Sequence, residues 1–202
     1  HENRGLTDWV RTVADRIAEA GYIAITPDLL SGKAPGGGRT KDFASQSDAT
    51  EAIGKLVPAD VTADLGAVAD YAATIPSANG KLAVIGFCWG GGQVWRFALA
   101  RPGLVLACPF YGTAPKDADF SKIPCPVQGF YGGSDSRVNA TLDATSAGMK
   151  AAGKTFEPVL YEGAGHAYMR GGEAVDGSPA NKAAMTASWE RLLKLLAAAA
   201  AH

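Results

Sequence analysis

Apolar residues along this chain fall into two alternating patterns. Short, continuously apolar runs are typical of strands buried on both faces, and longer stretches with apolar residues every three or four positions are typical of helices. The runs that predict strands are 21–30, 81–87, 104–112, 126–132 and 156–163. The stretches that predict helices are 7–20, 60–75, 91–100, 139–152 and 180–200. This alternation predicts the α/β class, with a mostly parallel central sheet and helices on both faces.

The chain length and apolar content suit one hydrophobic core. With 202 residues, of which 47% are hydrophobic, we expect a single domain over residues 1–202. The first residue is His1 rather than methionine, and we expect N-terminal strands of the sheet to be missing from this sequence, upstream of that residue. A signal peptide would also lie upstream of His1, so a cytoplasmic and a periplasmic location both stay open.

Charge and cysteine content exclude several classes of function. The 19 basic and 20 acidic residues nearly cancel, so the sequence lacks the basic character of a nucleic-acid-binding protein. No apolar run approaches the roughly 20 residues that span a membrane. The three cysteines contain no CxxC pair, which argues against a zinc site and a disulfide framework. We expect a small-molecule partner, no nucleic acid or membrane, and a monomer or weak homo-oligomer.

The stretch GFCWGGG, residues 86–92, lies between a predicted strand and a predicted helix. A dinucleotide-binding GxGxxG motif would need a glycine in place of Cys88, and a P-loop would need a Lys-Ser or Lys-Thr pair after the glycines. Neither requirement is met. The remaining pattern is the nucleophile elbow, in which Gly86 and Gly90 allow a sharp turn and the residue between them points at substrate. Cys88 is therefore the candidate nucleophile.

A cysteine at this position is well placed for nucleophilic chemistry. The positive end of the following helix favours a thiolate, and the backbone N–H of Trp89 can donate to a developing oxyanion. The alternative is a buried structural cysteine, which is the ordinary environment of a free thiol. The glycines on both sides of Cys88 favour the catalytic interpretation.

A nucleophile of this kind needs a histidine base and an acid that orients it, in the chain order nucleophile, acid, histidine. Of the three histidines, only His166 lies away from the chain ends, on a glycine-rich loop after the last predicted strand. Asp135, in YGGSD, follows the preceding strand, and the crevice of an open α/β sheet forms at such strand ends. A solvated surface histidine is the alternative for His166. The competitors for the acid are Asp117, Asp119 and Asp143, which lie in loops or a helix.

The motifs GFCWGGG, YGGSD and GAGHAYMR occur in this order, with HENRGL upstream. Together they resemble the dienelactone hydrolase family of α/β-hydrolases, and the resemblance covers essentially the whole chain. It implies a catalytic triad with Cys88 as nucleophile, Asp135 as acid and His166 as base. The implied activity is that of a carboxymethylenebutenolidase, the hydrolysis of a lactone or ester through a thioester intermediate, with no metal or organic cofactor.

The resemblance also assigns residues outside the triad. Glu2 matches a family glutamate that takes part in activating the nucleophile, and the backbone N–H of Asn3 would be the second oxyanion donor. Arg170 matches an arginine that binds the carboxylate of a dienelactone. Arg39, in the aperiodic loop 33–48, is a weaker match to a second such arginine. The alternatives are a solvated loop carboxylate for Glu2 and a surface cation for Arg170.

Aromatic residues near the predicted strand ends are candidates for the walls of an apolar pocket. Tyr111 and Tyr168 are the expected substrate contacts, whereas Phe87 and Tyr131 are better explained as core residues. Three other functions stay open: a general carboxylesterase for neutral esters, a non-catalytic binding protein of the same fold, and a cysteine redox sensor.

Overall fold

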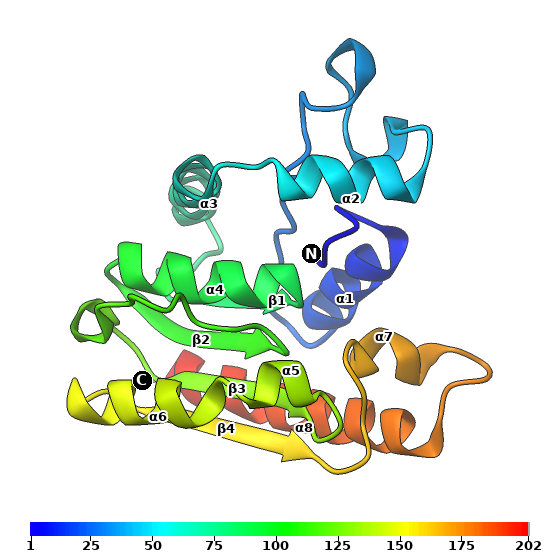
Figure 1. Cartoon of the computed structure of the whole chain (residues 1–202). Helices are drawn as coiled ribbons and strands as arrows, with labels where there is room; N and C mark the ends of the chain where they lie inside the picture. Colours follow the sequence, from blue (N-terminus) through cyan, green and yellow to red (C-terminus); the bar gives the residue numbers. More distant parts are fainter. Residues whose placement is uncertain (202) are drawn as a thin grey trace. The chain divides into compact units, whose positions relative to one another are not determined.

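The computed structural model describes residues 1–201 and divides the chain into two compact units, His1–Gly80 and the part from Lys81 onward (Figure 1). The prediction of a single domain stays a prediction. The first unit holds α1 (Asp8–Glu19), the 3₁₀ turns η1 (Pro35–Gly37) and η2 (Thr40–Asp42), α2 (Gln46–Gly54) and α3 (Pro58–Ala73). The second holds β1 (Leu82–Phe87), α4 (Trp89–Ala100), β2 (Leu104–Phe110), η3 (Phe120–Lys122), β3 (Val127–Gly132), α5 (Ser136–Asn139), α6 (Leu142–Ala151), β4 (Phe156–Tyr161), α7 (Tyr168–Glu173) and α8 (Pro179–Ala201).

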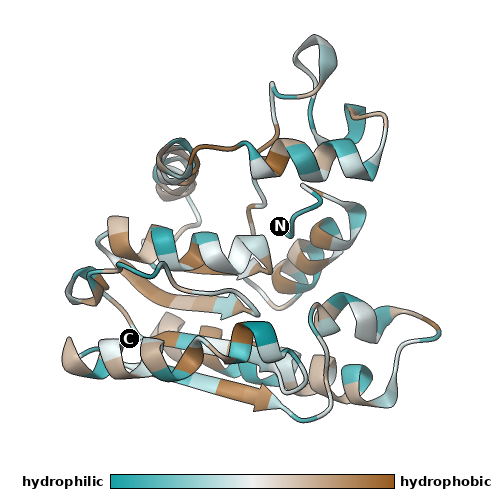
Figure 2. Cartoon of the chain, in the orientation of Figure 1, coloured by the Kyte–Doolittle hydropathy of each residue, from teal (hydrophilic) through white to brown (hydrophobic). Residues whose placement is uncertain are grey.

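The strands of the second unit form one parallel sheet in the order β1-β2-β3-β4. Every residue of β3 is buried, and β2 is buried apart from Val105. The two edge strands are less deeply buried, and β4 exposes Glu157 and Leu160. Figure 2 shows β2 mainly in the brown of apolar residues. The parallel sheet predicted from continuously apolar runs is confirmed.

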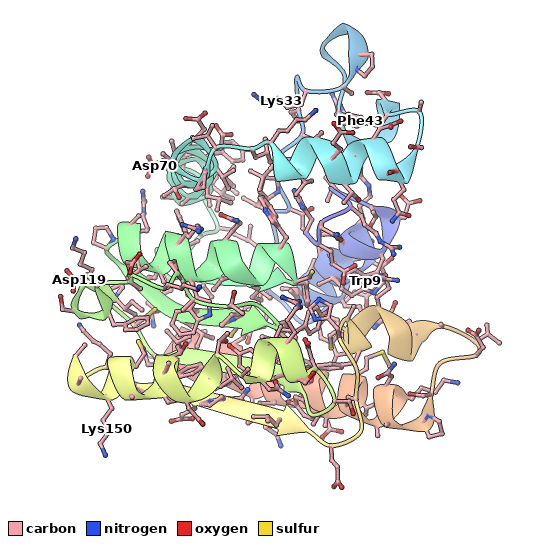
Figure 3. All side chains as sticks on the ribbon, in the orientation of Figure 1. Trp9, Lys33, Phe43, Asp70, Asp119 and Lys150 are labelled. Carbon is pink, nitrogen blue, oxygen red and sulfur yellow. The ribbon has the colours of Figure 1, made fainter. Side chains whose placement is uncertain are left out.

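Helices cover both faces of this sheet. Helix α4 packs on β1 and β2 with α6 on the same face, and α8 lies on the opposite face (Figure 1). The buried Trp95 of α4 makes edge-on ring contacts with Phe156 of β4 and Phe120 of η3, at centroid distances of 5.1 and 6.0 Å. On α6, Met149 is buried, whereas its neighbour Lys150 points away from the sheet (Figure 3). The apolar residues that recur along these helices therefore face the sheet.

One arginine fastens α8 to the sheet. Arg191 donates to the carbonyl oxygens of Gly129 and Glu157, at 2.8 and 3.0 Å, and to the side-chain oxygen of Gln128 at 2.6 Å. Its guanidinium lies 4.3 Å from the centre of the Phe130 ring. These contacts satisfy polar groups of β3 and β4 and fix the position of α8, from which other side chains reach the candidate site.

In the first unit, Asp28 holds the long loop between residues 31 and 45. Its carboxylate accepts hydrogen bonds from the Thr40 hydroxyl at 2.6 Å and the Thr40 N–H at 3.0 Å. The Thr40 hydroxyl oxygen in turn accepts from the Leu6 N–H at 3.1 Å. A Cβ at Gly5 would lie 2.3 Å from that oxygen, so this close approach requires glycine. The loop is therefore tied at Thr40 to the first residues of the chain.

The prediction of a strand at residues 21–30 is wrong. Residues 22–28 adopt no regular secondary structure, and the sheet is built entirely from strands after residue 81 in the described chain. A strand needs a neighbour for its backbone hydrogen bonds, and apolar composition alone does not supply one. Ile23 and Ile25 are 46% and 37% exposed, so the apolar run predicted burial that these side chains do not have.

Three helices, α2, α5 and α7, were not predicted from the sequence. Helix α2 begins at Gln46 within the predicted loop 33–48, although Ser45 caps it by accepting from the Asp48 N–H at 3.1 Å. Helix α7 is short and contains two glycines, which gives it no sequence signal. The helix predicted over residues 139–152 is α6, preceded by the separate turn of α5. No helix within residues 1–201 is long and apolar enough to cross a membrane.

Candidate active site

Cys88 occupies a strained turn between β1 and α4. Its backbone angles are φ 54° and ψ −114°, a conformation that few residues other than glycine adopt. A Cβ at Gly86 would lie 2.4 Å from the carbonyl oxygen of Gly90, so this turn requires glycine at position 86. The Cys88 N–H donates to the Phe110 carbonyl at 3.0 Å, which ties the turn to the end of β2. This geometry is that of a nucleophile elbow.

The first turn of α4 lies directly against the end of β2. A Cβ at Gly91 would be 2.6 Å from the Phe110 carbonyl oxygen, and one at Gly112 would be 2.3 Å from the carbonyl carbon of Gly91. No side chain separates the two backbones at this point. The N–H of Trp89 belongs to this first turn. The backbone N–H groups in the first turn of a helix are not used in hydrogen bonds within the helix, and they lie at the positive end of the helix dipole.

Asp135 lies in the loop that follows β3. It is the N-cap of α5, and its Oδ1 accepts from the Val138 N–H at 3.4 Å. The side-chain amide of Asn139 donates to the carbonyl oxygens of Gly132 and Gly133, at 2.9 and 3.1 Å. The loop is thus held at both ends of its turn, and the carboxylate of Asp135 is buried.

Backbone hydrogen bonds join the loop of Asp135 to the loop after β4 that carries His166. The Gly133 N–H donates to the Tyr161 carbonyl at 2.7 Å, and the Ser134 N–H donates to the Ala164 carbonyl at 2.9 Å. Neither bond depends on a side chain. The separation of acid and histidine is therefore set by the backbone of two adjacent strand ends.

The loop of His166 approaches the end of β3 closely. A Cβ at Gly132 would lie 2.5 Å from the Gly165 carbonyl oxygen. The side chain of Asn181, from α8, accepts from the Gly165 N–H at 3.0 Å. Ala167 has φ 58°, in the left-handed region, and directs the chain into α7. These three features fix the loop on both sides of the imidazole.

The structure brings the three predicted side chains together. The Nδ1 atom of His166 lies 2.5 Å from Oδ2 of Asp135, and its Nε2 atom lies 3.1 Å from Sγ of Cys88. The imidazole side chain is 31% exposed, whereas the Asp135 side chain is 6% exposed. The histidine therefore faces a buried carboxylate on one side and a thiol on the other.

The rival aspartates lie elsewhere. Asp117, Asp119 and Asp143 are exposed. Asp119 accepts hydrogen bonds from the N–H and hydroxyl of Ser121, and Figure 3 shows it at the end of the second unit opposite the carboxyl ends of the strands. These positions favour Asp135 as the partner of His166.

The pKa values of His166, Cys108 and Cys125 are all raised, but for different reasons. The hydrogen bond with Cys88 and, after it, the hydrogen bond with Asp135 raise the pKa of His166 to about 9, against the opposing effect of desolvation. Burial raises the pKa of the Cys108 thiol far above its ordinary value and that of Cys125 to about 11. Cys108 and Cys125 are therefore protonated at neutral pH, which makes them poor nucleophiles.

The two tyrosines predicted to contact substrate are buried. Tyr111 contacts His166 with 5.1 Å between ring centroids, and the hydroxyl of Tyr168 lies 2.7 Å from Oγ of Ser188. Arg170 lies in α7 and is partly exposed. Their assignment as substrate contacts stays a prediction.

The other predicted residues belong to the first unit. Glu2 is only 3% exposed, which is unlike a solvated loop carboxylate, and its carbonyl oxygen lies 2.8 Å from Nδ1 of His1. Asn3 is exposed. Arg39 is also exposed, and its N–H donates to the Asp42 carboxylate at 2.8 Å. The roles of Glu2, Asn3 and Arg39 stay predictions.

Sequence reasoning missed the residues that support the two loops. Asn139 and Asn181 act through side chains that reach backbone groups, and Asn181 lies 16 residues beyond its partner. Neither asparagine belongs to a motif, so no sequence signal identifies them.

Comparisons with known proteins identify the family of this chain. The dienelactone hydrolase family matches residues 1–200. A Methylorubrum extorquens protein provisionally named carboxymethylenebutenolidase is 31% identical over 180 residues, covering 81% of this chain and 60% of the relative. An Escherichia coli K12 protein of the same provisional name is 30% identical, covering 94% of this chain and 72% of its own length. This chain thus spans less than two thirds of the first of these relatives.

The fold is that of the same family. The crystal structure of a provisionally assigned dienelactone hydrolase from Klebsiella pneumoniae superposes with a TM-score of 0.83 at 27% identity, covering 97% of this chain and 83% of that one. The parallel sheet of this chain, flanked by helices, is an α/β-hydrolase fold. The chain belongs to the dienelactone hydrolase family.

Proposed function

We propose that this protein hydrolyses a lactone or carboxylic ester through an acyl-thioester on Cys88. The observation that carries the proposal is the pair of contacts made by one imidazole. Nε2 of His166 lies 3.1 Å from the Cys88 sulfur, and Nδ1 lies against the buried Asp135 carboxylate. Nucleophile, base and orienting acid in this arrangement support acyl transfer.

In the first half of the reaction, the thiolate of Cys88 attacks the carbonyl carbon and the π electrons move to the carbonyl oxygen. The N–H of Trp89, at the positive end of α4, stabilises this oxyanion. The C–O bond to the leaving group then breaks, and the leaving oxygen takes a proton from Nε2 of His166. An acyl-thioester and an alcohol or enol result.

In the second half, a water molecule attacks the thioester while His166 accepts its proton at Nε2. The C–S bond breaks, and its electrons return to Cys88 as a thiolate beside the imidazolium. Asp135 orients the ring and stabilises its positive charge in both halves. Over both halves, one water is consumed and the ester becomes an acid and an alcohol or enol, which stay in one molecule when the substrate is a lactone.

The substrate we propose is a lactone that carries a carboxylate, as the name of the relatives indicates for them. Arg170, partly exposed in α7 and four positions after His166, would bind that carboxylate. A general carboxylesterase for neutral esters is the second candidate, because the thiol and imidazole would act on both classes of substrate.

Trapping of the intermediate tests the proposal. The protein is mixed with a dienelactone or a neutral aryl ester, quenched in acid within the first turnovers, digested and analysed by mass spectrometry. We expect the acyl group on the peptide that contains Cys88 and on neither peptide with Cys108 or Cys125. Hydrolysis without an adduct on Cys88 would contradict the thioester route. Equal kcat/KM for the two substrates would favour the general carboxylesterase.

The raised pKa of His166 predicts how activity depends on pH. Because the pKa is raised from 6.5 to about 9, the imidazolium persists through neutral pH and loses its proton as the pH rises through that value. Loss of this proton removes the acid that protonates the leaving oxygen. We expect kcat/KM for an alkyl ester to fall above about pH 9.

A matched substrate separates this effect from denaturation. A p-nitrophenyl ester of the same acid releases a phenolate that needs no proton, so its kcat/KM should fall much less over the same range. Return to pH 7 should restore full activity. An identical alkaline decline for both esters would contradict the role of His166 as the proton donor.

A further inference from the structure

Tyr111 has a strained backbone at the end of β2. Its φ is 39°, in the region that favours glycine, and this conformation is strained in a residue that carries a side chain. The Tyr111 N–H donates to the Phe130 carbonyl at 2.7 Å, which holds this conformation. Glycine would relieve the strain. A tyrosine here therefore indicates a role for its side chain.

The ring of Tyr111 packs against the imidazole of His166. Their centroids are 5.1 Å apart and their planes meet at 63°, an edge-to-face arrangement that is favourable for aromatic pairs. The tyrosine is 1% exposed, so its ring lies inside the protein, whereas the imidazole side chain that it contacts is 31% exposed. Such a ring is better suited to support the histidine than to touch substrate.

Tyr111 is itself held by a second buried ring. Tyr168 lies 5.4 Å from it, centroid to centroid, with the planes at 70°. The Tyr168 hydroxyl is fixed by Ser188 of α8 at 2.7 Å, and both residues are fully buried. The contacts run without interruption from α8 through two tyrosines to His166. The tyrosine rings that the imidazole packs against therefore have little freedom to move.

We propose that Tyr111 is a positioning residue that holds the imidazole of His166 in place while Cys88 carries the acyl group. The inference rests on the proposed function. In the resting protein, His166 contacts Cys88 at Nε2 and Asp135 at Nδ1. Once the sulfur is acylated, it no longer offers a thiolate to Nε2, and Asp135 alone leaves the ring free to swing about its remaining contact. The ring of Tyr111, packed against the imidazole, prevents that swing, so Nε2 stays aimed at the attacking water.

This role predicts that deacylation depends on the ring at position 111 more than acylation does. We expect Tyr111→Leu to slow deacylation about tenfold or more, because small displacements of a catalytic group are costly, and to leave acylation nearly unchanged. Tyr111→Phe keeps the ring and should restore deacylation to near the wild-type rate. The measurement is the burst and steady-state phase of p-nitrophenyl ester hydrolysis at pH 7, which separates the two steps.

Ser188→Ala provides a second route if Tyr111→Leu folds poorly. It removes the hydrogen bond to Tyr168 far from the reacting atoms, and we expect a smaller loss that is again confined to deacylation. Wild-type deacylation in a folded Tyr111→Leu variant, or equal losses in both steps, would overturn the proposal. A Tyr111→Phe variant as slow as Tyr111→Leu would also overturn it, since the hydroxyl rather than the ring would matter. Turnover that survives Cys88→Ala would instead refute the proposed function itself.

Discussion

Replacement of Cys88 by alanine is expected to lower kcat/KM for a dienelactone and for a neutral aryl ester by roughly 10⁴-fold or more. Without Sγ no thioester forms, and the pair of His166 and Asp135 has no nucleophile to assist. The loss should lie in kcat, because the thiol takes part in bond making rather than in substrate binding. Steady-state hydrolysis of the two substrates, wild type beside variant, measures it.

Cys125→Ala is the matched control for this experiment. It is the same kind of substitution, but the thiol it removes lies in a buried position just before β3, where burial keeps it protonated. Its kcat/KM should equal that of the wild type. An active Cys88→Ala variant would show that the reaction does not use this thiol. A wild type that hydrolyses neither substrate, yet undergoes reversible oxidation at Cys88, would favour a redox role.

Local apolar patterns predicted most of the fold. Four continuously apolar runs became β1 to β4, and the regions of helical spacing became α1, α3, α4, α6 and α8. In the second unit these patterns succeed because α4, α6 and α8 bury apolar residues against the strands of the sheet. Residues 21–30 failed because strand formation depends on a partner strand, and composition does not report whether that partner is present.

The residues of the candidate site also differ in whether the sequence around them could identify them. Cys88 could be recognised from the glycines around it, because the sharp turn places a steric demand on the adjacent sequence positions. His166 could be recognised because one histidine lies away from the chain ends. The contact of Tyr111 with His166 and the hydrogen bond from the Gly165 N–H to Asn181 could not be predicted, since they join residues that only the folded chain brings together. The nucleophile and the histidine could therefore be predicted from the sequence, whereas the contacts that support the histidine from other loops could not.

The close approach of α4 to β2 predicts a large effect of Gly91→Ala on stability. The added Cβ would lie 2.6 Å from the Phe110 carbonyl oxygen and 2.9 Å from Cα of Gly112, and both are backbone atoms with little room to yield. The Phe110 carbonyl also accepts from the Cys88 N–H, so moving it would loosen the elbow. We expect the free energy of unfolding to fall by about 3 kcal/mol, with a parallel loss of kcat.

Gly92→Ala is the control one position further along the same helix. Its Cβ would meet only the Thr113 carbonyl oxygen, at an ordinary 3.7 Å, and alanine favours helix over glycine by about 1 kcal/mol. Urea unfolding should therefore place the midpoint of Gly91→Ala well below wild type and that of Gly92→Ala at or above it. Since both variants add one methyl group to the same helical turn, opposite shifts can arise only from the contact with β2. Equal shifts would mean that the elbow is not held by this contact, and the conformation of Cys88 would need support from elsewhere.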